Sequence, residues 1–130
     1  MVSPPHPPLS EWETALERNK SDVYRAHLRN LIRLLRAERR HVVVLPQHFI
    51  AVNREDEVFV KGVRQHNEVN REVAEEFQIP FLGTLTSASP FRREDTVDNC
   101  HFNERGSTKM AEKVFQLLRQ QRLLPMNVSG

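Results

Sequence analysis

The chain has 130 residues, of which 38% are hydrophobic and 28% charged, and its 19 basic and 17 acidic residues leave a net charge of +2. This composition is typical of one soluble globular domain, and the charge is too small to indicate a nucleic-acid partner. The longest apolar runs, such as Val42 to Leu45, are far below the roughly 20 residues that span a bilayer, and no signal peptide is visible. We therefore expect a soluble protein without a membrane span, cytoplasmic by default.

Four of the eight prolines lie within the first eight residues, which predicts an extended arm rather than a regular helix. We assign residues 1–21 to this Pro-rich arm, 22–121 to the folded domain and 122–130 to a C-terminal tail. Cys100 is the single cysteine, so neither an internal disulfide nor a Cys-rich zinc site can support the core. Stability must come from packing.

Three segments show the apolar spacing of amphipathic helices. The first runs from Asp22 to Arg39 after a capping Ser21, with arginines every three or four positions that favour a solvated face over an anionic partner. The second spans Val63 to Phe77, and the third follows a capping Asn103 and ends near Gln121.

Two short apolar segments between these helices predict strands: His41 to Leu45, and a weaker one from Ile79 to Leu85 that contains Pro80 and Gly83. Alternating helices and buried strands indicate α/β architecture with a parallel sheet. Two strands make a thin sheet with an open apolar edge, so we expect self-association or a partner that supplies the missing half.

The segment from Asp98 to Gly106 carries the chemistry. It reads Asp-Asn-Cys-His-Phe-Asn-Glu-Arg-Gly and leads directly into the last predicted helix. An isolated Asp-x-x-His is often only a capped turn. A histidine can also serve as a general base near neutral pH, and a carboxylate on its other ring nitrogen fixes the tautomer.

This block, with its Asn, Gly and following helix, resembles the last motif of the SGNH (GDSL-type) hydrolases, and the resemblance covers about residues 22–121. It implies a partial flavodoxin-like, three-layer α/β/α fold with a short parallel sheet, equivalent to the second half of that family. It also implies that His101 is the general base of a Ser-His-Asp triad and that Asp98 orients it, without a metal or other cofactor.

The chain departs from the family where the nucleophile is concerned. None of its serines stands in a Gly-Asp-Ser setting, and the family's oxyanion Gly and Asn blocks are absent. We therefore expect the carboxyl-terminal half of an ester hydrolase that is inactive alone, with a small-molecule, lipid or carbohydrate ester as substrate. The alternative is a non-catalytic α/β interaction module that binds through its exposed sheet edge.

Other positions carry weaker hypotheses. Gln47 and His48 follow the first predicted strand and are candidate substrate contacts, although a surface histidine is the commoner explanation. Arg92 and Arg93, in the loop that leads to Asp98, could steer an anionic substrate or be merely exposed. Cys100 is interpreted as a small filler, and no metal site is expected, because the remaining histidines show no ligand spacing.

Overall fold

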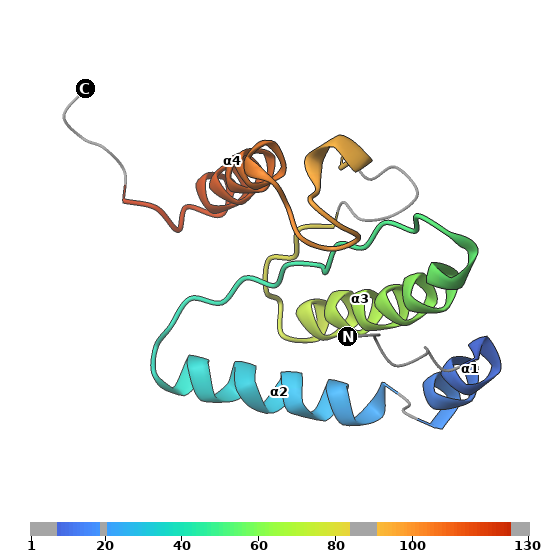
Figure 1. Ribbon diagram of the computed structural model, residues 1–130. Coiled ribbons are helices and arrows are strands. Elements are labelled where there is room, and N and C mark those ends of the chain that lie inside the picture. Colours follow the sequence, from blue (N-terminus) through green and yellow to red (C-terminus); the bar gives the residue numbers. More distant parts are fainter. Residues whose placement is uncertain (1–7, 19–20, 84–90, 126–130) are drawn as a thin grey trace, which may run out of the picture.

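The protein is described here by a computed structural model that places residues 8–18, 21–83 and 91–125 (Figure 1). Its elements are the α-helices α1 (Leu9–Arg18), α2 (Asp22–Ala37), α3 (Glu57–Glu76) and α4 (Glu104–Gln120) and the 3-10 helices η1 (Arg54–Asp56) and η2 (Arg93–Asp95). Over these placed ranges, no helix is long and apolar enough to cross a bilayer.

Helices α2 and α3 lie side by side and run in the same direction (Figure 1). Later residues of α2 contact later residues of α3, as expected for parallel helices. Tyr24 donates a hydrogen bond to Asn70, and ion pairs join Arg25 to Glu72 and Arg29 to Glu76. The arginine stripe of α2 is therefore not only a solvated face, because it binds the acidic side of α3.

The hydrophobic core fills the space between these two helices and the two extended segments that run back beside them. Partly buried aromatic side chains, Tyr24, Phe77 and Phe81, pack around it. The buried members of the core are Ile32, Val44, Val69, Val73, Ala74 and Ile79.

The two segments predicted as strands meet at one parallel bridge, between Val44 and Phe81. Val44 N–H donates to the Pro80 carbonyl at 3.0 Å, and Leu82 N–H donates to the Val44 carbonyl at 3.1 Å. The next bond in one direction would need an N–H on Pro46, and in the other direction an N–H on Pro80. Proline has none, so two prolines limit the ladder to a single bridge.

The predicted fold class is therefore wrong. The described part of the chain is helical and contains two isolated bridges but no sheet, so it is not a partial flavodoxin-like, three-layer α/β/α fold with a short parallel sheet. The end of the second predicted strand, at Leu85, lies outside the described residues. Self-association through an open edge beside Val44 stays a prediction.

The predicted helices are confirmed with small changes at their ends. The first ends at Ala37 rather than Arg39, the second begins six residues before Val63, at Glu57, and the third follows the Asn103 cap as expected. Helix α1 was not predicted, and it lies within the segment 1–21 that was assigned to an extended arm. The first seven residues of that arm lie outside the described ranges.

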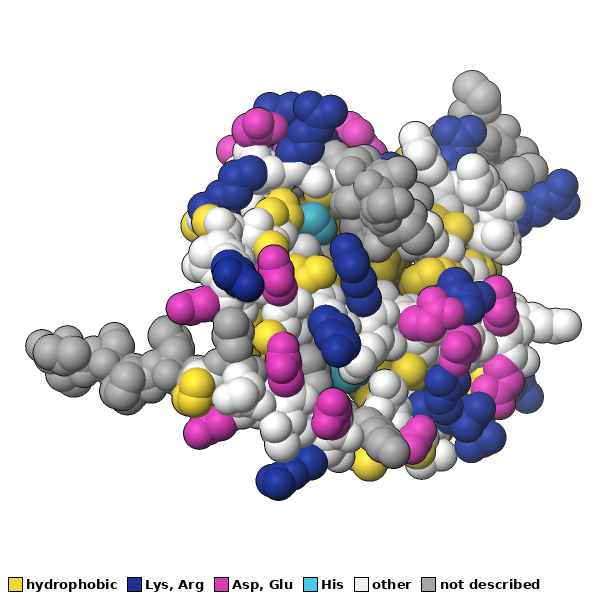
Figure 2. Space-filling view, turned by 90° about the vertical axis from the view of Figure 1, so that its right-hand side faces the viewer, with side chains coloured by type: hydrophobic (Ala, Val, Ile, Leu, Met, Phe, Trp, Pro, Cys, Tyr) yellow, Lys and Arg dark blue, Asp and Glu magenta, His cyan; other side chains and the backbone are white. Residues whose placement is uncertain are grey.

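Charged side chains of both signs cover the outside. On the face in Figure 2, Lys and Arg are interspersed with Asp and Glu rather than gathered into a large patch of one sign. Some apolar side chains are also exposed, among them Leu31 and Leu34 on α2. The charge on this face therefore points to no particular anionic or cationic partner.

We predict that Ile32→Ala lowers the free energy of unfolding by about 2–5 kcal/mol, because Ile32 is 1% exposed and its truncation leaves a cavity between α2 and α3. Leu34→Ala on the same helix is the matched control: Leu34 is 63% exposed, and its truncation should cost no more than about 0.5 kcal/mol. Urea unfolding of both variants measures the difference. Equal losses would contradict this packing of α2.

Candidate functional site

Asp98 and His101 lie in a short loop between η2 and α4. A β-bridge between Thr96 and Phe102 closes the loop at its base. Val97 N–H donates to the His101 carbonyl at 2.9 Å across it. The residues that form the predicted motif are thereby held in one tight turn.

The Asp98 carboxylate contacts both the backbone and the side chain of this turn. Its Oδ1 accepts hydrogen bonds from the N–H groups of Cys100 (2.9 Å) and His101 (2.7 Å), and its Oδ2 lies 2.7 Å from His101 Nδ1. The Cys100 and His101 N–H groups, followed by the His101 ring, hold the pKa of Asp98 well below its usual range. An ionised carboxylate only accepts, so Nδ1 carries the proton and Nε2 has a free lone pair in the neutral ring.

Both side chains are open to solvent. The His101 side chain is 75% exposed and that of Asp98 is 51% exposed. The Arg93 guanidinium donates to the Asp98 carbonyl at 3.0 Å, so it braces the loop rather than standing free. The sequence-predicted pair is thus assembled, with the Nε2 side of the ring accessible.

Asn99 fastens the loop to the rest of the molecule, a role that no sequence pattern predicted. Its side-chain amide donates to the Ile50 carbonyl at 3.0 Å and to Asp56 Oδ2 at 2.8 Å, and its carbonyl accepts from Ile50 N–H at 2.7 Å. Asp56 also accepts the N–H groups of Val52 and Asn53, which with Asn99 lower its pKa. The loop is therefore tied to the segment that begins α3.

A second missed residue, Asp95, anchors the other side of the loop. Its side chain is fully buried, yet Lys109 Nζ lies 2.7 Å from one oxygen and Arg105 Nε lies 3.1 Å from the other. Arg92 N–H also donates to it at 2.9 Å. The Lys109 hydrogen bond is the largest cause of a lowered Asp95 pKa. A buried charge needs such partners, so Asp95 joins η2 to the first turns of α4.

His48 lies beneath the loop rather than on the surface. It is 7% exposed and its ring stacks on Phe102 at a centroid distance of 5.1 Å, with Phe91 at 5.2 Å. Burial lowers its pKa, and the negative charge of Asp95 only partly offsets this. The commoner explanation of His48 as a surface histidine is therefore wrong, and its position fits support of the loop better than substrate contact.

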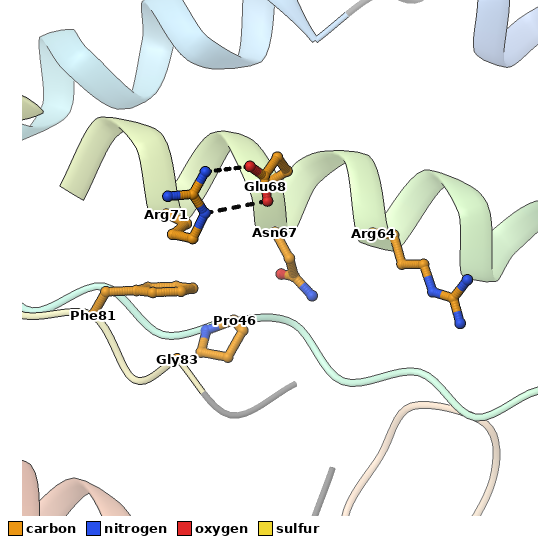
Figure 3. Close-up of a pocket in the computed structure, with 7 residues that line it drawn as sticks. All are labelled: Pro46, Arg64, Asn67, Glu68, Arg71, Phe81 and Gly83. Atoms are coloured by element: carbon orange, nitrogen blue, oxygen red, sulfur yellow. Dashed lines mark hydrogen bonds and ion pairs between the residues drawn. The ribbon is translucent and has the colours of Figure 1, made fainter. Parts of the chain in front are cut away.

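Gln47 is exposed, and its backbone is held by Asn67 of α3. Asn67 accepts from Gln47 N–H and donates to the Gln47 carbonyl, both at 2.8 Å. Beside this contact lies a cavity of about 290 Å³, shown in Figure 3, between α3 and the segments that end at Pro46 and Gly83. The cavity is lined by Pro46, Arg64, Asn67, Glu68, Arg71, Phe81 and Gly83.

Cys100 lies beside the pair, with its Sγ 3.5 Å from His101 Nδ1. Burial and the negative charge of Asp98 raise the pKa of its thiol, which disfavours a nucleophilic thiolate. Within the placed ranges, no hydrogen bond joins His101 to a serine.

No protein-family model, curated protein or solved structure matches this chain.

At Gly106, α4 lies close against the end of η2. A Cβ at this position would lie 2.1 Å from the Asp95 carbonyl oxygen and 2.7 Å from the Phe102 ring. We predict that Gly106→Ala lowers the free energy of unfolding by about 1–3 kcal/mol because the backbone must move. A Cβ at Gly83 would meet only the Phe81 ring, at 3.8 Å, so Gly83→Ala is a near-neutral control in urea unfolding. Equal losses would contradict the close approach.

The buried His48 predicts a loss of stability in mild acid. The unfolded chain protonates this ring near its ordinary pKa of 6.5, whereas burial lowers the pKa in the folded chain. Unfolding therefore takes up a proton, and the free energy of unfolding should fall as the pH drops below about 6.5. His48→Phe should flatten this part of the stability–pH profile, and His27→Gln, at an exposed site on α2, should leave it unchanged. An unaltered slope in His48→Phe would contradict the assignment.

Proposed function

We propose that Asp98 and His101 are the orienter and general base of a serine-type ester hydrolase, and that the nucleophilic serine lies outside this loop. The observation that carries the proposal is the hydrogen bond of 2.7 Å between Asp98 Oδ2 and His101 Nδ1. This contact is the one that a Ser-His-Asp triad requires between its acid and its base. The resemblance of the segment from Asp98 to Gly106 to the SGNH hydrolases supports the same function.

The chemistry follows from the tautomer that Asp98 selects. With its proton on Nδ1, neutral His101 presents the Nε2 lone pair, which can take a proton from a serine hydroxyl as that oxygen attacks an ester carbonyl. The resulting imidazolium is stabilised by the ionised Asp98 and can return the proton to the leaving alkoxide. Two backbone N–H groups keep the other Asp98 oxygen in place, which supports a fixed orientation.

The chain offers no serine in a nucleophile motif, so the proposal places that serine in another segment or another chain. Without the nucleophile and an oxyanion hole, the base and its orienter supply little catalysis, since the triad acts as a unit. The proposed substrate class is a carboxylic ester of a small molecule, lipid or carbohydrate. The exposed Nε2 side of His101 is where the serine would approach.

We predict that these 130 residues alone hydrolyse an activated acetate ester no faster than His101→Ala does. Co-expression with the coding sequence directly upstream should supply a serine in a Gly-Asp-Ser setting, and that serine should react with a fluorophosphonate probe. In the complex, His101→Ala should abolish labelling, and Asp98→Asn should lower turnover by about 10⁴-fold because it favours the wrong tautomer.

His41→Gln is the matched control, because His41 is an exposed histidine distant in sequence from the loop. It should change neither labelling nor turnover. An upstream frame without such a serine, or labelling that persists in His101→Ala, would contradict the proposed function.

A further inference from the structure

Three different metal-binding side chains converge in the loop that carries the Asp98–His101 pair. One ligand atom from each of Asp98, Cys100 and His101 lies within 4.8 Å of the other two, and no other such group occurs in the part of the chain that is described. The three side chains lie within four consecutive residues, 98–101. The spacing of the other histidines, on which the expectation of no metal rested, therefore does not bear on this group.

The donor set matches a borderline-soft cation. Tetrahedral bonds of about 2.3 Å to sulfur and about 2.0 Å to nitrogen place those two atoms about 3.5 Å apart. This equals the separation of 3.5 Å between Cys100 Sγ and His101 Nδ1. When the cation displaces the Cys100 thiol proton into solvent, the resulting thiolate, the carboxylate and a neutral imidazole together cancel the charge of a divalent cation. Mg²⁺ and Ca²⁺ prefer oxygen ligands and are disfavoured by the sulfur and nitrogen.

The carboxylate is already positioned for such a ligand role. Backbone N–H groups of Cys100 and His101 hold its Oδ1, which leaves Oδ2 on the side of the imidazole. That oxygen lies 2.7 Å from Nδ1, so a cation must replace the proton between them and widen the gap slightly. The side chains of Asp98 and His101 are 51% and 75% exposed, which leaves room for the two atoms to move apart.

We propose that Asp98, Cys100 and His101 form a binding site for Zn²⁺ or a similar borderline-soft divalent cation, with His101 bound through Nδ1 and a water completing the tetrahedron. This stands against the sequence-based expectation of no metal. A cation on Nδ1 forces the imidazole proton onto Nε2, so metal occupancy removes the lone pair that a general base uses. That inhibitory consequence rests on the proposed function, whereas cation binding does not.

The binding itself is tested on the whole 130-residue chain, kept reduced. Co²⁺ titration should produce a thiolate charge-transfer absorption that saturates at one Co²⁺ per chain. Added Zn²⁺ should displace the Co²⁺ and remove this absorption, and competition with a chromophoric chelator should give the Zn²⁺ affinity. Cys100→Ser should abolish the thiolate absorption. Each of Cys100→Ser, Asp98→Asn and His101→Gln should weaken Zn²⁺ binding by more than about tenfold. His41→Gln should bind as the parent chain does. Zn²⁺ binding of unchanged strength in Cys100→Ser, or equally strong binding of Mg²⁺ to the parent chain, would overturn the proposal.

The tautomer separates this site from the proposed hydrolase. Long-range ¹H–¹⁵N NMR of the His101 ring should report a proton on Nδ1 in the metal-free chain and on Nε2 after Zn²⁺ is added. A proton that stays on Nδ1 would overturn ligation by that atom, whatever the catalytic role of the loop. In the co-expressed complex, Zn²⁺ should suppress fluorophosphonate labelling and a chelator should restore it. Zn²⁺ binding with undiminished labelling would refute inhibition, whereas labelling independent of His101 would refute the hydrolase proposal alone.

Discussion

The buried carboxylate of Asp95 is the constraint on which the candidate site depends. A charge without solvent contact is tolerated only with close partners, and this one has Lys109 and Arg105 on α4 and a backbone N–H of Arg92 on its own turn. These contacts bring α4 against η2 so closely that only glycine fits at position 106. The loop between the two elements then has both ends fixed, and residues 97–101, between the bridged Thr96 and Phe102, form the turn.

Aspartate carboxylates organise this region at three successive points. The tripeptide Arg-Glu-Asp forms η1 and occurs again as η2, and each time its Asp accepts the N–H of the residue three positions earlier, at 3.1 Å for Asp56 and 2.9 Å for Asp95. Asp98 instead accepts hydrogen bonds from the N–H groups of residues that follow it, Cys100 and His101. Asn99 then bonds to Asp56, so the first turn is joined to the loop that follows the second. Short polar motifs thereby do the positioning that a sheet would otherwise provide.

The sequence predicted those elements that depend on the order of side chains, and it failed for those that depend on backbone hydrogen bonds between distant segments. Amphipathic spacing predicted three of the four α-helices in the described part of the chain, because the order of side chains along the sequence determines which face of a helix is apolar. Strand formation failed as a prediction, since apolar side chains at Val42 to Leu45 and around Phe81 indicate burial but not hydrogen bonding. The missing N–H groups of Pro46 and Pro80 decided the outcome. Both prolines were visible, but their effect depends on the register between two distant segments.

The same distinction applies to the site. The Asp98–His101 contact was predictable because a turn brings residues three apart together. Asn99 and Asp95 were not, because their partners lie on other elements, and a polar loop residue in a sequence does not reveal whether it is solvated or bonded. His48 was misjudged for a related reason: an imidazole is compatible with both water and an aromatic environment, and only its placement against Phe91 and Phe102 decides between them.

The exposure of His101 then limits what the loop achieves by itself. The low pKa of Asp98 arises from local hydrogen bonds, with the Cys100 N–H first, so the carboxylate stays ionised and orients the ring even in water. Electrostatic stabilisation of a developing imidazolium is stronger where water is excluded, and a side chain that is 75% exposed does not have that benefit. A surface that covers Nε2 would exclude water from the ring and could also contribute the group that reacts with it. A small cation instead approaches from the Nδ1 side, where the loop already supplies three ligands, and needs no covering surface at all.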